Sequence, residues 1–98
     1  MISHDDGNQL VKLAKDAVRA YFSGERLKPD KIFQRRFNEK RGVFVTIYKN
    51  DELRGCIGFP EPVFPLWEGV IKAAQSAAFG DPRFNPLEKD ELDEVRFE

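Results

Sequence analysis

The sequence is poor in the residues that build covalent or metal cross-links. Its 98 residues include one cysteine, Cys56, and one histidine, His4. A single cysteine excludes an internal disulfide, and two such residues fall short of the four Cys or His ligands of a typical structural zinc site. We therefore expect no metal and no cofactor, and this composition suits a reducing cytoplasm.

Long apolar runs are also missing, and we expect no leader segment. The longest strongly apolar stretch, Val43 to Tyr48, is much shorter than the roughly 20 residues of a membrane-spanning helix. The first six residues have neither the basic nor the apolar region of a signal peptide. With 41% hydrophobic and 34% charged residues, residues 1–98 have the composition of a single globular domain. We expect a cytoplasmic protein with no membrane partner.

The net charge of −1 hides an imbalance between the two halves of the chain. Residues 1–50 hold eleven Lys and Arg against six Asp and Glu, whereas residues 51–98 hold five against eleven. Seven cations are concentrated in one segment: Arg26, Lys28, Lys31, Arg35, Arg36, Lys40 and Arg41. Such a segment attracts phosphate, so nucleic-acid binding is one hypothesis, with the last four of these residues as its main contacts. The alternative is an ordinary solvated surface.

Hydrophobic periodicity predicts two main helices. Apolar residues recur at helical spacing from about residue 8 to residue 22, with Asp5 or Asp6 as the cap and Gly24 as a left-handed stop. An alanine-rich helix is predicted over residues 66–79.

Between these helices, β-branched and aromatic residues predict a hairpin. Its strands cover residues 42–48 and 53–59, joined by a two-residue turn at Asn50 and Asp51. This turn would pair Tyr48 with Leu53, Val45 with Cys56 and Phe44 with Ile57. One face would then carry Phe44, Tyr48, Leu53 and Ile57, and the other Val43, Val45, Ile47, Arg54, Cys56 and Gly58. Both faces are largely apolar, so we expect both to be covered.

The remaining segments complete an α+β prediction. Residues 31–41 are ambiguous between a short helix and irregular structure, and the acidic residues 88–94 are expected to form a solvated surface. Residues 95–98 alternate like the beginning of a strand. The predicted fold class is α+β, with an antiparallel hairpin or sheet packed against the two main helices.

The segment from Arg54 to Gly58 is the first candidate for a functional site. Glycines inside a strand cost stability and indicate a bulge or the close approach of a ligand or backbone. Arg54 offers forked donors to a carboxylate or phosphate, and a second block holds Asp81 and Arg83. The candidate ligand-binding residues are Arg54, Gly55, Gly58, Asp81 and Arg83. The alternative is structural: the glycines make room for the alanine-rich helix, and the charged residues form ion pairs.

Cys56 is a candidate catalytic nucleophile. A reactive thiol needs a neighbouring base or cation, and His4 is the only histidine. The alternative is an inert, buried thiol.

Four blocks together resemble the AMMECR domain family. In chain order they are Gly42-Val-Phe-Val-Thr, the hallmark Leu53-Arg-Gly-Cys-Ile-Gly, the Pro-Leu opening of the alanine-rich helix, and Phe79-Gly-Asp-Pro-Arg-Phe-Asn-Pro-Leu. The resemblance implies an α+β fold and places residues 1–98 as the N-terminal portion of such a domain, because family members continue past residues 95–97. It implies no established activity. Family members often neighbour or are fused to Memo-like and radical-SAM proteins, which implies a macromolecule-modification system.

Several functions follow as hypotheses. The first is a module that binds a small anionic or nucleotide-like ligand at the Arg54–Gly58 segment. The alternatives are a nucleic-acid-binding protein, a protein-interaction scaffold, and an enzyme that depends on Cys56.

Overall fold

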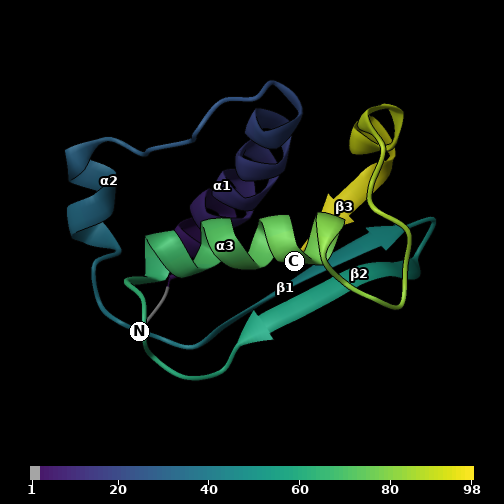
Figure 1. Cartoon of the computed structure of the whole chain (residues 1–98). Coiled ribbons are helices and arrows are strands. Elements are labelled where there is room, and N and C mark those ends of the chain that lie inside the picture. Colours follow the sequence, from purple (N-terminus) through teal and green to yellow (C-terminus); the bar gives the residue numbers. More distant parts are fainter. Residues whose placement is uncertain (1–2) are drawn as a thin grey trace.

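Helices and a three-stranded antiparallel sheet form an α+β fold, which a computed structural model describes over residues 3–98 (Figure 1). In chain order the elements are α1 (His4–Phe22), α2 (Lys31–Arg36), β1 (Val43–Lys49), β2 (Glu52–Phe59), α3 (Leu66–Phe79), the 3-10 helix η1 (Lys89–Glu94) and β3 (Val95–Phe97). The sheet order is β2-β1-β3. The predicted fold class and the helix over residues 66–79 are confirmed. None of the helices in this described range is long and apolar enough to cross a membrane.

Helix α1 begins four residues before the predicted start. Its cap is Ser3, whose side chain accepts a hydrogen bond from the Asp6 backbone N–H at 3.0 Å. The prediction of Asp5 or Asp6 as the cap is wrong, because both lie in the first turn, where their negative charge favours the helix dipole. Gly24 has a φ of 69° after the helix, as predicted.

The ambiguous segment after this helix contains α2. The Asp30 side chain caps it by accepting a hydrogen bond from the Phe33 backbone N–H at 2.8 Å. Phe37 follows directly and is 3% exposed, so this segment is attached to the core by an aromatic anchor.

The hairpin has the predicted turn but a different register. Asn50 and Asp51 have φ values of 53° and 62°, and two positive φ values at this position are typical of a type I′ turn. Tyr48 pairs with Leu53, as predicted, but the next pair is Ile47 with Gly55. Arg54 is therefore the extra residue of a β-bulge.

The bulge changes every pair beyond it. Thr46 pairs with Cys56, Val45 with Ile57 and Phe44 with Gly58, so the predicted Val45–Cys56 and Phe44–Ile57 pairs are wrong by one residue. Because side chains alternate along a strand, the shift moves Cys56 and Gly58 to the face of Phe44 and moves Ile57 to the face of Val45.

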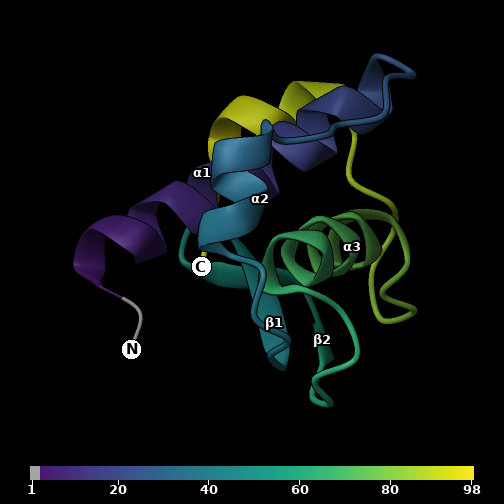
Figure 2. The same ribbon diagram turned by 90° about the vertical axis from the view of Figure 1, so that its left-hand side faces the viewer.

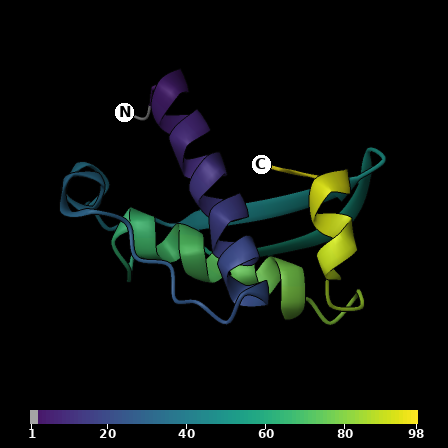
Figure 3. The ribbon, with the colours of Figure 1, turned by 90° about the horizontal axis from the view of Figure 1, so that it is seen from above.

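The helices cover one face of the sheet. Helices α1 and α3 lie on the same side of the hairpin, and α3 runs along it (Figures 2 and 3). The core between these layers contains Val45 and Ile47 from the sheet and the buried alanines of α3. The expectation that both faces are covered is wrong for residues 3–98, since Phe44 is 64% exposed on the opposite face.

Candidate functional site

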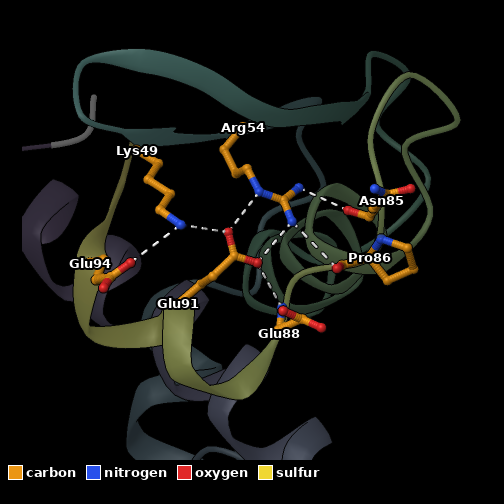
Figure 4. A network of polar contacts seen from close by, with 7 residues as sticks. All are labelled: Lys49, Arg54, Asn85, Pro86, Glu88, Glu91 and Glu94. Atoms are coloured by element: carbon orange, nitrogen blue, oxygen red, sulfur yellow. Dashed lines mark hydrogen bonds and ion pairs between the residues drawn. The ribbon is translucent and has the colours of Figure 1, made fainter.

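Arg54 lies in a network of hydrogen bonds between the hairpin and η1 (Figure 4). Its Nε and Nη2 donate to the two carboxylate oxygens of Glu91, both at 3.0 Å. Its Nη1 donates to the Asn85 carbonyl at 2.8 Å, and Nη2 also donates to the Pro86 carbonyl at 3.3 Å. The side chain is only 16% exposed. Of the five guanidinium N–H groups, one on Nη1 has no partner in the described chain.

Glu91 is the neighbour of Arg54 that the sequence analysis does not identify. The acidic segment was expected to be solvated, but the Glu91 side chain is 12% exposed and also accepts a hydrogen bond from Lys49 Nζ at 3.0 Å. The Arg54 guanidinium, foremost, lowers the pKa of Glu91 to about 2, and the same carboxylate raises the pKa of Lys49. Glu88 and Glu91 cap the start of η1 reciprocally. Two capping residues three positions apart are a sequence signal for the start of a helix, and this signal can identify Glu91.

Asp81 and Arg83 hold the outer edge of β2. Asp81 is 5% exposed, and its carboxylate accepts a hydrogen bond from the Cys56 backbone N–H at 3.0 Å. The Arg83 guanidinium donates to both oxygens of Asp81, at 3.0 and 2.7 Å, and to the Cys56 carbonyl at 3.3 Å. This ion pair gives Cys56 one acceptor and one donor, as a neighbouring strand would. The Arg83 guanidinium holds the pKa of Asp81 well below its usual range.

A shallow hollow brings the two arginines together. Its lining residues are Arg54, Pro82, Arg83, Phe84 and Asn85. The Arg83 side chain is 57% exposed, and its guanidinium carbon lies 5.4 Å from the centre of the Phe84 ring. No hydrogen bond from Arg83 Nη1 to residues 3–98 is present, so this group can donate to a ligand.

The glycines of the candidate site lie elsewhere. A Cβ atom on Gly55 would lie 2.2 Å from the Ala77 carbonyl oxygen, so this glycine permits the close approach of α3. A Cβ atom on Gly58 would meet the Phe44 ring on the opposite face of the sheet. The structure therefore brings Arg54, Asp81 and Arg83 together and separates them from Gly58.

Cys56 places its thiol on the uncovered face of the sheet. Its Sγ lies 3.3 Å from Thr46 Oγ1, and this is its only side-chain hydrogen bond to the described residues. A hydroxyl is not the base that a catalytic thiol requires. The catalytic role of Cys56 stays a prediction.

The basic segment is partly neutralised. Arg36 forms an ion pair with Asp6, and Arg41 pairs with Glu39 at 3.1 Å. Arg35 and Lys40 are exposed. Nucleic-acid binding through these four cations stays a prediction. Over residues 3–98 there is also no group of three His, Cys, Asp or Glu side chains that could hold a metal ion.

Comparisons with known proteins give a consistent result. A family model described as AMMECR1 matches residues 11–98. The chain is 47% identical to a protein of Methanothermobacter thermautotrophicus, covering 99% of the chain and 51% of that protein. It is 50% identical to a protein of Thermoplasma acidophilum, covering 99% of the chain and 48% of that protein.

A solved structure is similar as well. The crystal structure of an uncharacterised protein from Pyrococcus horikoshii superimposes with a TM-score of 0.90 at 40% identity, covering 98% of the chain and 50% of that protein. The chain thus spans about half the length of the relatives that it matches.

Proposed function

The chain belongs to the AMMECR1 family, and from that premise we propose that it is a module that binds a small anionic ligand in the hollow between Arg54 and Arg83. The observation that carries the proposal is the hydrogen bonding of the Arg83 side chain. Three of its hydrogen bonds go to Asp81 and Cys56, while Nη1 has no acceptor in the part of the chain that the structure describes.

The fixed guanidinium suits the recognition of an anion. Because Asp81 already orders the Arg83 side chain, a ligand would lose little of the rotamer entropy that a mobile arginine costs. The free amino group can donate two hydrogen bonds to a carboxylate or phosphate. Arg54 lines the same hollow and has one more unused N–H group.

The hollow also contains an aromatic surface. Phe84 lies beneath the Arg83 guanidinium, so the lining combines cations with one flat apolar ring. A nucleotide or another phosphorylated aromatic compound presents both a negative charge and a ring. We therefore favour nucleotide-like anions among the small anionic ligands. A wider role in a macromolecule-modification system, beside Memo-like or radical-SAM proteins, is what the family resemblance implies.

Arg83 is the residue with which to test the proposal, because Arg54 is needed by the network around Glu91. The measurement is thermal unfolding of the wild type and of Arg83→Gln with inorganic phosphate, pyrophosphate, AMP and ATP. A ligand at about 100 times its Kd adds about 2.7 kcal/mol to the free energy of unfolding. For a domain of this size each kcal/mol raises Tm by roughly 4–8 °C.

The expected result is a rise in Tm with at least one of these anions that disappears in Arg83→Gln. Arg35→Gln is the matched control, because it removes an exposed arginine from α2 and should keep the rise. An equal rise in wild type and Arg83→Gln, or no rise with any of the four anions, contradicts the proposal.

A further inference from the structure

A groove lies between α3 and the segment that joins α1 to α2, which runs alongside this helix (Figure 3). Its volume is about 840 Å³, against about 420 Å³ for the hollow between Arg54 and Arg83. We call it the α3 groove, and we define it by six of its lining residues: Tyr21, Arg26, Lys28, Trp67, Glu68 and Lys72. None of them lines the hollow at Arg83, so the groove is a separate candidate site.

Helix α3 presents a second face to this groove. Its buried alanines face the core. Trp67 and Ile71 lie four residues apart on another face, as do Glu68 and Lys72, and all four line the groove. Trp67 packs against the core while remaining partly exposed, so its ring is held in place and part of it is accessible.

Tyr21 supplies a second aromatic ring from the end of α1. Its ring stacks on that of Phe79, with the centres 4.0 Å apart and an angle of 25° between the planes. Tyr21 is nevertheless 55% exposed. Phe79 therefore orders a ring that remains accessible, and ordered aromatic rings are the surfaces on which nucleic-acid bases stack.

Three cations surround these rings. Arg26, Lys28 and Lys72 are exposed, and none of them forms an ion pair with a carboxylate of residues 3–98. Positive charge continues beyond the groove into α2, where Lys31 and Arg35 are also exposed. Cations beside accessible aromatic rings match a strand in which every unit carries a phosphate and a base.

The groove continues into a second hollow, which favours a polymer over a single nucleotide. The two share Tyr21 and Lys72, and the second is also lined by Phe59 and Phe64. The Lys72 Nζ atom lies 5.2 Å from the centre of the Phe64 ring. Aromatic rings and a shared cation thus connect the two hollows. A peptide does not present a ring and a negative charge in each successive unit, whereas a nucleic-acid strand does.

Glu68 can distinguish one base from another. It is partly buried, and among residues 3–98 its carboxylate has no hydrogen-bond or ion-pair partner. A carboxylate accepts a hydrogen bond from an exocyclic amino group, such as N4 of cytosine. Uracil has a carbonyl oxygen at the same position, which a carboxylate repels.

We propose that the α3 groove binds single-stranded nucleic acid. The bases stack on Tyr21 and Trp67, the three cations of the groove contact the phosphates, and Glu68 selects cytosine over uracil. This site differs from the cluster of Arg35, Arg36, Lys40 and Arg41, none of which lines the groove. It also shares no residue with the anion site at Arg83, so either proposal can fail alone.

The test is binding of oligonucleotides of about ten nucleotides to the whole chain, a length within the range of single-strand binding sites. Trp67 is the only tryptophan, so its fluorescence reports directly from the groove. We expect oligocytidylate to quench this fluorescence, with an affinity that falls as the salt concentration rises. Oligouridylate should bind about tenfold more weakly. Ribose and deoxyribose forms of oligocytidylate distinguish RNA from DNA, and binding of either supports the proposal.

A first set of variants tests the stacking. Tyr21→Ala should weaken the binding of oligocytidylate about tenfold, whereas Tyr21→Phe, which keeps the ring, should not. Phe44→Ala is the matched control, because it removes an aromatic ring that is 64% exposed on the sheet face opposite the helices.

A second set tests the charges. Lys72→Gln should reduce the slope of log affinity against log salt by about 0.7. Lys89→Gln, which removes an exposed lysine of η1, should leave the slope unchanged. Glu68→Gln should make the affinities for oligocytidylate and oligouridylate equal, because an amide can both donate and accept a hydrogen bond.

Five outcomes overturn the proposal. They are no binding of any oligonucleotide, binding without a change in Trp67 fluorescence, unchanged affinity in Tyr21→Ala, equal affinity of the wild type for oligocytidylate and oligouridylate, and equal quenching of Trp67 by polyglutamate of the same charge. The last outcome would make an acidic polypeptide the occupant.

Discussion

The two faces of the hairpin use the residues of one short motif in opposite ways. On the helix side, Arg54 is held by Glu91 and two carbonyls, and Gly55 lies against the backbone of α3. On the other side, Cys56 and Gly58 lie on the face that carries the exposed Phe44. The bulge at Arg54 therefore divides residues 54–58, a continuous motif in the sequence, between the two faces of the sheet. Its helix-side members contact η1 and α3, whereas its other members lie on the opposite face of the sheet.

The largest expected effect is that of Arg54→Met. Removing the guanidinium leaves the Glu91 carboxylate, which is 12% exposed, without its main partner, and breaking such a pair costs about 3–5 kcal/mol. The measurement is chemical denaturation. We expect the double variant Arg54→Met, Glu91→Leu to recover much of this lost stability, because the unpaired Glu91 charge is then gone. Simple addition of the two single losses would show that Arg54 and Glu91 are not energetically coupled and would contradict the stabilising role of the pair.

The next effect is a loss of stability in acid. The pKa of Glu91 is lowered from 4.5 to about 2, so its carboxylate stabilises the folded state fully above about pH 4.5. This contribution is lost as the pH falls from 4.5 to 2 and amounts to about 3 kcal/mol. Unfolding curves at pH 6, 4.5, 3 and 2 would measure it. Glu91→Gln should flatten the dependence, and an unchanged slope would contradict the assignment.

A smaller effect separates the two glycines. Gly55→Ala places a Cβ atom 2.2 Å from a backbone oxygen of α3, which cannot move without the helix, so we expect a loss of about 2 kcal/mol. Gly58→Ala meets only the ring of Phe44, an exposed side chain that can rotate away. Its Tm should change by much less. Equal losses of stability in the two variants would contradict the distinction between the two faces of the sheet.

The smallest effect concerns the sheet face opposite the helices. Phe44→Ser should change the free energy of unfolding by less than about 1 kcal/mol, because the side chain is 64% exposed. A loss as large as that of Gly55→Ala would show that Phe44 stabilises the fold despite its exposure.

Most of the fold could be predicted because its signals are local. The spacing of the alanines, with a proline before them and a glycine after them, predicts the helix over residues 66–79. The pair Asn50-Asp51 predicts the hairpin turn from a four-residue stretch of sequence. The resemblance to a known family was likewise carried by short blocks of sequence, and the match over residues 11–98 confirms it.

The glycines indicate a bulge or a close approach in this strand, but the position of the bulge at Arg54 could not be predicted, because its cause is distant in sequence. Arg54 leaves the regular register to reach Glu91 and Asn85, which lie more than 30 residues later. Nothing between Leu53 and Phe59 reveals that partner. The same reason explains why Glu91 was assigned to a solvated surface, since an acidic segment looks alike whether or not one member is enclosed. An ion pair between Asp81 and Arg83 is one of the alternatives that the sequence offers. The sequence does not indicate that this pair also forms hydrogen bonds with the Cys56 backbone.

The hydrogen bonds from Asp81 and Arg83 to the Cys56 backbone also affect where another strand can pair with the sheet. Exposed strand edges are where protein molecules join into aggregates, and natural proteins protect them. At Cys56 the edge of β2 is already occupied by the Asp81–Arg83 pair, so a strand from another molecule would have to displace a buried carboxylate. Among residues 3–98, no strand pairs with the opposite edge of the hairpin at Val43 to Val45. The loop that holds Asp81 and Arg83 therefore blocks strand addition to β2 at Cys56.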